Sequence, residues 1–67
     1  MKVQYFPDTD TDTVLVTLNN QPVALTKDLD ENTLFDLDSA GNLVSITIEH
    51  AKERVDISNF SFEQIAA

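Results

Sequence analysis

Three aspartates at alternate positions come closest to the spacing of a metal site. Asp8, Asp10 and Asp12 repeat the first three ligand positions of a calcium-binding loop, and hard cations favour carboxylate oxygens. The rest of that loop is missing, because Thr13 stands where it requires glycine and Asn19 where it requires a bidentate glutamate. A polar turn, in which Asp and Thr side chains bond nearby backbone amides, is therefore favoured over calcium binding.

A second group of acids surrounds a predicted turn in the middle of the chain. Its members are Asp28, Asp30, Glu31, Asp36 and Asp38. Carboxylates that share the exposed face of a strand lie close enough to attract a cation or a cationic side chain. We predict that these five acids contact a basic protein partner; the alternative is an ordinary solvated surface, which accounts for most charge runs of this kind.

The remaining reactive residue types form no recognisable catalytic set. His50 is the single histidine, cysteine is absent, and no serine lies in a nucleophile-elbow pattern. The one glycine excludes a glycine-rich phosphate loop, and 67 residues leave little room for the cleft that a glycosidase needs around its paired carboxylates. We therefore predict that the protein is not an enzyme, has no cofactor, and uses His50 only to cap the end of an element.

The composition limits both partners and location. Twelve acids against four bases give a net charge of −8, which repels the phosphates of nucleic acids and of anionic membranes. No segment approaches the about 20 apolar residues of a membrane span, and the N-terminus lacks an apolar run of signal-peptide length. We expect a cytoplasmic protein that binds neither nucleic acid nor membrane.

Alternation of apolar and polar residues predicts strands along most of the chain. The pattern is clearest over residues 14–18, 35–38 and 44–49, and further strands are predicted at 2–6 and 23–28. Connections as short as these join antiparallel neighbours. We predict a single domain, residues 1–67, of the α+β class but mainly β: a five-stranded antiparallel meander with a short C-terminal helical turn.

Two turns have informative residues. Residues 38–42 begin with an acid and place the only glycine, Gly41, where a positive φ is required, which predicts a hairpin with a bulge. Asn32 is predicted to adopt the left-handed conformation in the preceding turn.

The C-terminal tail carries apolar side chains that need a surface. Ser61 and Gln64 have the spacing of a capping box, which predicts the helical turn there, but one turn is unstable alone. A single sheet has an apolar face that needs a cover, so we expect Phe60, Phe62 and Ile65 to supply it, within the chain or across a homodimer. The small core and the exposed strand edges also favour a homodimer.

Residues 1–10, 34–51 and 54–57 together resemble the small bacterial DUF2283 family, and 36–51 is the most specific part. The chain departs from the usual pattern in a longer first turn, in the lack of a tyrosine at 14–16, and in having Ser45 for glycine and Lys52 for serine. The resemblance implies a small β-rich protein of unknown function. Some members are encoded beside small toxin-like proteins, which implies an antitoxin-like role in which an acidic module covers a basic surface.

Overall fold

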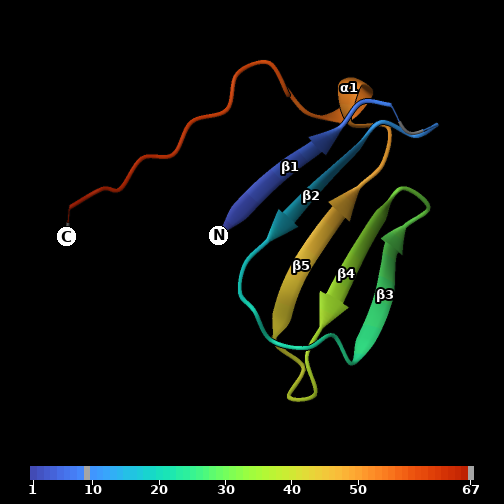
Figure 1. Cartoon of the computed structure of the whole chain (residues 1–67), viewed down its shortest axis with the longest axis vertical. Coiled ribbons are helices and arrows are strands. Elements are labelled where there is room, and N and C mark those ends of the chain that lie inside the picture. Colours follow the sequence, from blue (N-terminus) through green and yellow to red (C-terminus); the bar gives the residue numbers. More distant parts are fainter. Residues whose placement is uncertain (9, 67) are drawn as a thin grey trace.

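Five strands form one antiparallel sheet with a short helix at one end, in a computed structural model that describes residues 1–8 and 10–66 (Figure 1). The strands are β1 (Lys2–Phe6), β2 (Thr13–Thr17), β3 (Leu25–Asp30), β4 (Thr33–Leu37) and β5 (Leu43–Ile48), and the helix is α1 (Ala51–Arg54). The predicted fold class, five antiparallel strands with one short helical turn, is confirmed.

The order of the strands across the sheet is β1-β2-β5-β4-β3, which differs from that of a meander. The connection after β2 runs past the ends of β5 and β4, so that β5 pairs with β2 and β3 lies at the far edge (Figure 1). Three strands joined by hairpins and a fourth reached by a longer connection form a Greek key. The composition explains the order: β5 is the most apolar strand and lies at the centre, whereas Lys27, Asp28 and Asp30 suit β3 to an edge.

The pairing register collects apolar side chains on one side of the sheet, because residues directly opposite one another share a face. Val16 lies opposite Val3 on β1 and Ile46 on β5, and Ile46 lies opposite Phe35 on β4. We call this side the apolar face; its apolar members are Val3, Tyr5, Val14, Val16, Leu25, Phe35, Leu37, Ile46 and Ile48. The other side, the polar face, includes Gln4, Thr26, Asp36, Ser45 and Thr47, and also carries Leu15 and Leu34.

The hairpin between β4 and β5 has the predicted geometry. Gly41 has a φ of 85°, and a register shift between β4 and β5 marks the bulge. Asp38 organises the turn, since its Oδ1 accepts hydrogen bonds from the backbone N–H of Ala40 at 3.0 Å and of Asn42 at 2.8 Å. The hairpin with a bulge is confirmed.

The helix lies earlier in the chain than the capping-box spacing predicted. Residues 59–66, the C-terminal tail, have no regular structure, so the prediction of a helical turn at residues 61–64 is wrong. One helical turn needs a surface to pack on: Ala51 in α1 is fully buried, whereas Phe62 and Ile65 are 71% and 75% exposed. Within the described residues, α1 is the only helix, and none is long and apolar enough to cross a membrane.

Candidate protein-binding site

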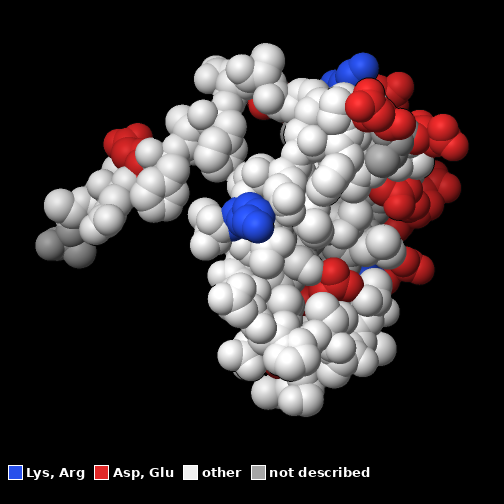
Figure 2. Space-filling view, in the orientation of Figure 1, with Lys and Arg blue, Asp and Glu red and all other residues white. Residues whose placement is uncertain are grey.

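Acids from segments far apart in the sequence lie at the same end of the sheet. The β1–β2 loop and the β3–β4 turn are both at the end where β5 leads into α1 (Figure 1). Figure 2 shows Asp and Glu side chains gathered over that end and along the β3 edge. We call this surface the acidic end; its exposed acids are Asp8, Asp10, Asp28, Asp30, Glu31 and Glu53.

Backbone hydrogen bonds fix these segments to one another. The N–H of Glu49 donates to the carbonyl of Asn32 at 2.8 Å, which ties the end of β5 to the β3–β4 turn. The N–H of His50 donates to the carbonyl of Thr11, which ties the same end of β5 to the β1–β2 loop. The acidic end is therefore one continuous surface rather than a set of independent loops.

Asp12 joins the β1–β2 loop to α1. Its Oδ2 accepts hydrogen bonds from the backbone N–H of Lys52 at 2.8 Å and from the hydroxyl of Tyr5 at 3.3 Å. Its carbonyl accepts the N–H of Ala51 at 2.9 Å. Partial burial, followed by the charge and the hydrogen bond of Asp12, raises the pKa of Tyr5. Asp12 therefore has a structural role, because its hydrogen bonds join the polar β1–β2 loop to α1.

The left-handed backbone positions lie where this loop meets α1. Among the described non-glycine residues, positive φ angles occur at Asp12, with 36°, and at His50, with 55°, so the prediction for Asn32 is wrong. His50 stands at the N-cap position of α1, and its carbonyl accepts the N–H of Glu53 at 3.1 Å. It marks the end of an element as expected, but its imidazole makes no capping hydrogen bond.

The three aspartates of the predicted calcium loop do not converge on a common point. Within residues 1–8 and 10–66, no three His, Cys, Asp or Glu side chains form a group that could hold a metal ion. Asp12 is directed to Tyr5 and α1, while Asp8 and Asp10 are exposed. Calcium binding stays a prediction from the sequence, without a geometric feature in its favour.

Arg54 fastens the β3–β4 turn to α1. Its Nη1 donates to the carbonyl of Asn32 at 2.7 Å, and its Nη2 donates to Oγ1 of Thr33 at 2.6 Å and lies 3.4 Å from Oδ2 of Asp30. The N–H of Asn32 donates to Oδ1 of Asp30 at 2.8 Å and is the main cause that lowers the pKa of this carboxyl. Thr33 and Arg54 lower it further, against partial desolvation. Together with Arg54, which acts as a clamp on this turn, these groups favour the charged form of Asp30.

The last two acids of the second predicted group lie outside the acidic end. Asp36 is on the polar face of β4, where its two carboxylate oxygens accept the hydroxyls of Thr26 on β3 and Ser45 on β5, each at 2.6 Å. Asp38 is in the hairpin at the opposite end of the sheet. Of the five predicted contact acids, Asp28, Asp30 and Glu31 lie at the acidic end, Asp36 lies further along the polar face on which Asp28 also stands, and Asp38 lies at the opposite end of the sheet.

The sequence alone did not reveal that β3 is an edge strand or that Arg54 is a clamp. Every residue of β3 is exposed, and β4 is its one partner in the sheet. An edge strand presents a row of unpaired backbone N–H and C=O groups. The signal for the edge was present in the lysine and the acids of residues 25–30, whereas nothing in the local sequence of Arg54 points to a turn 21 residues earlier.

The fold is that of a small, mainly β domain built on one antiparallel sheet, and in this chain acids gather at one end of it. The chain belongs to the DUF2283 family, a family of proteins of unknown function, whose model matches residues 2–52. The match includes all five strands and the start of α1, and the C-terminal tail lies outside it. No curated protein and no solved structure matches the chain.

Proposed function

We propose that this chain is a non-enzymatic protein-interaction module whose acidic end binds a basic surface of a protein partner. The observation in its favour is the convergence of acids from the β1–β2 loop, the β3–β4 turn and α1 on one hydrogen-bonded end of the sheet. A surface that is already fixed loses little conformational entropy on binding. Complementary charge accelerates the encounter and excludes acidic partners.

The edge of β3 supplies a second type of contact at the same place. Its outer backbone groups can accept a strand from a partner, since an extended peptide can extend a sheet at an exposed edge. Asp28 and Asp30 on this strand disfavour pairing of β3 with its own copy, because like charges would meet. The same charges favour a strand that carries Lys or Arg.

An antitoxin-like role is one form of this function. A toxin that acts on RNA needs a basic surface to hold the phosphate backbone. An acidic end that covers that surface would exclude the RNA by occupying the same charges. The net charge of −8 is consistent with this competition between the module and RNA for the toxin, because it disfavours binding of the module itself to RNA.

Co-purification with the protein encoded beside this gene tests the proposal. We expect retention at about 50 mM salt and release at about 500 mM, because salt screens exposed charges. The double variant Asp28→Asn, Glu31→Gln should bind about tenfold more weakly, since two exposed charges at a contact contribute on the order of 1 kcal/mol together.

Asp56→Asn with Glu63→Gln is the matched control. It makes the same chemical change and the same change in net charge, but on the segment after α1 and on the tail. Binding by this control should stay within about twofold of the unaltered chain. No retention at low salt would contradict the proposed function, and equal weakening by both double variants would show that net charge, rather than the acidic end, controls binding.

A further inference from the structure

The apolar face of the sheet has no covering layer over most of its width. In Figure 1, no helix and no second sheet lies over β3 or β4. Leu25 on β3 is 52% exposed and Val3 on β1 is 39% exposed. Among the described residues, the buried apolar ones are Val14, Val44 and Ala51, and no large side chain is fully enclosed. The chain alone therefore has very little hydrophobic core.

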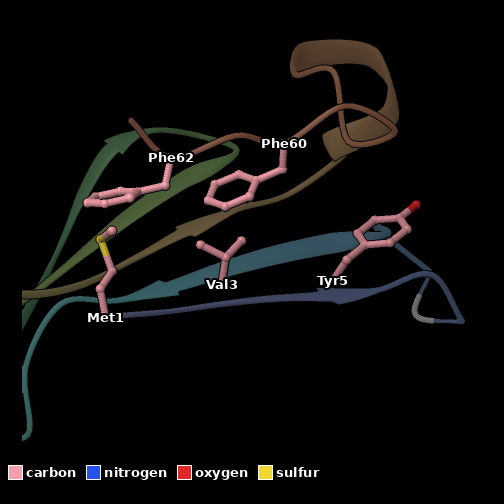
Figure 3. A pocket seen from close by; sticks show the side chains of 5 residues that line it. All are labelled: Met1, Val3, Tyr5, Phe60 and Phe62. Carbon is pink, nitrogen blue, oxygen red and sulfur yellow. The ribbon is translucent and has the colours of Figure 1, made fainter. Parts of the chain in front are cut away.

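The tail and β1 face each other across an open pocket. In Figure 3, Phe60 and Phe62 project from the tail toward β1, Met1 and Val3 project back toward them, and Tyr5 stands on the same side of β1 with its hydroxyl directed away from the rings. These five residues line a pocket of about 520 Å³. The rings do not fill it, since Phe60 and Phe62 remain 66% and 71% exposed. A second pocket of about 290 Å³ extends from there over β2 and β5.

The exposed area is larger than a compact chain of this size requires. The accessible surface is 5135 Å² for a mass of 7.5 kDa. Scaling with mass gives about 4,200 Å² for a compact monomer. The excess of about 900 Å² comes from the extended C-terminal tail and the open apolar face together. Each partner in an interface of standard size buries about 800 Å².

The distribution of charge favours a second copy of this chain as the protein that covers the apolar face. Lys27 and Asp30 are the charged residues on the apolar face of the strands, and both are on β3 at its margin. The other acids of the acidic end lie on loops, in α1 or on the other face of β3, and Asp36 is on the polar face. Two copies with a charge of −8 each would repel one another through most other surfaces, but here the facing area is mainly apolar, with Asp56 at the edge of the second pocket.

We propose that two copies of this chain pack their apolar faces together as a symmetric homodimer. The two sheets would form the layers of a sandwich, about 10 Å apart, and both copies would use the same surface. The pocket between β1 and the tail of each copy receives apolar side chains of the other. The acidic ends remain free, so the dimer carries two copies of the proposed partner-binding surface.

The tail of the same chain does not provide this cover. It leaves the sheet on the side of β1 and runs away from β5, β4 and β3 (Figure 1). Ile65 near its end is 75% exposed. The tail encloses one margin of the apolar face and leaves Leu25 and its neighbours at the other margin open. The sequence predicted that Phe60, Phe62 and Ile65 cover this face, within the chain or across a homodimer; in the proposed homodimer the apolar face of the second copy covers it instead.

Sedimentation equilibrium of the full chain between about 1 and about 100 µM tests this interface. We expect the mass of a dimer in the upper part of this range. Val3→Lys, on the apolar face, should weaken self-association at least about tenfold, because a charge would enter an apolar interface. Gln4→Lys is the matched control on the polar face of the same strand and should leave association within about twofold. Both variants bring the net charge nearer to zero, so added repulsion cannot explain a loss.

A second variant keeps the test decisive if Val3→Lys does not fold. Phe60→Ser with Phe62→Ser removes two exposed rings from the tail, so the sheet should keep its circular dichroism while self-association weakens about tenfold. A monomer at all concentrations would overturn the proposal. So would a dimer that neither Val3→Lys nor the tail variant weakens, or one that Val3→Lys and Gln4→Lys weaken equally. Val3→Lys should retain binding to the basic partner, which separates this proposal from the proposed function.

Discussion

The acidic end and the apolar face of the same sheet are stabilised in opposite ways. At the acidic end, Asp12 and Arg54 connect loop, turn and helix through hydrogen bonds within one chain. At the apolar face, Val3 and Leu25 lie open, and the phenylalanines of the tail stand apart from the strand that they face. The polar region is complete in a single chain, whereas the apolar region is not.

This difference follows from the nature of the two interactions. Hydrogen bonds are directional and can be satisfied within a small chain by a few well-placed groups. Burial of apolar surface requires a second layer, and the strands and their connections take up residues 2–48, which leaves little chain to build it. A small domain of this type can therefore present a fixed charged surface by itself, and the proposed homodimer would complete its core.

Gly41→Val should cause the largest loss of stability among these variants. Gly41 lies outside both the acidic end and the apolar face, in the hairpin that joins β4 to the central strand β5. We expect a loss of about 3 kcal/mol in the free energy of unfolding, measured with urea, since a β-branched residue is strained at a φ of 85°. No atom lies within 4 Å of an added Cβ, so the cost comes from the backbone and not from a clash. Gly41→Asn should lose much less, because Asn tolerates this conformation. Equal losses would indicate that the side chain rather than φ is responsible.

Asp12→Ala should break the acidic end where its loop meets α1. We expect about 2 kcal/mol of destabilisation in urea unfolding, because the N–H of Lys52 and the hydroxyl of Tyr5 lose their acceptor. Asp10→Ala in the same loop removes an equal charge from an exposed position and should change stability by less than about 0.5 kcal/mol. The idea that hydrogen bonds hold this end would be contradicted if the two variants were equally stable.

The sequence predicted local structure well and the long-range arrangement less well. Alternation identified five strands, and the acid and glycine of residues 38–42 identified their hairpin, because both signals act between near neighbours. The predicted meander placed β3 beside β2, but β5 takes that position, because β5 is the more apolar strand and is partly buried, whereas every residue of β3 is exposed. The sequence also overestimated the capping box at residues 61–64, because a cap cannot hold a turn that has nothing to pack on.

The candidate site shows the same division. The acids Asp28, Asp30 and Glu31 are close in the sequence and remain close in the structure. The direct contact of the β1–β2 loop with the end of β5, through the N–H of His50 and the carbonyl of Thr11, depends on the strand order, because β2 pairs with β5. The hydrogen bonds of Asp36 depend on which face of β4 its side chain occupies, since Thr26 and Ser45 lie opposite it in the two neighbouring hairpins. Charge clusters are thus predictable from sequence where they are local, but the surface that they form together is not.

Arg54→Ala should loosen the clamp on the β3–β4 turn by a smaller amount. We expect about 1 kcal/mol of destabilisation, because the bonds to Asn32 and Thr33 are lost but the side chain is already 31% exposed. Hydrogen exchange at the amides of the turn should accelerate, while exchange in the β4–β5 hairpin stays unchanged. Uniform acceleration across the sheet would contradict a local clamp.

The charge of Asp30 should give the smallest of these effects. Its pKa is lowered in the folded chain, so its stabilising contribution is present above the ordinary pKa of an aspartate and is lost as the pH falls through the folded value. Asp30→Asn should therefore flatten the decrease of the melting temperature below about pH 4. Arg54→Ala should flatten it less, because the N–H of Asn32 is the main cause of the shift. A greater effect of Arg54→Ala would reverse that assignment.

The contrast between the acidic end and the apolar face is tested most directly by the salt dependence of partner binding and of homodimer formation. Sedimentation velocity of the chain with the protein encoded beside it, at about 50 and about 500 mM sodium chloride, measures both associations in one sample. We predict that high salt dissociates the basic partner from the acidic end and leaves the homodimer intact, because screening weakens exposed charge pairs and not apolar contacts. Loss of both associations at high salt, or persistence of both, would contradict the account.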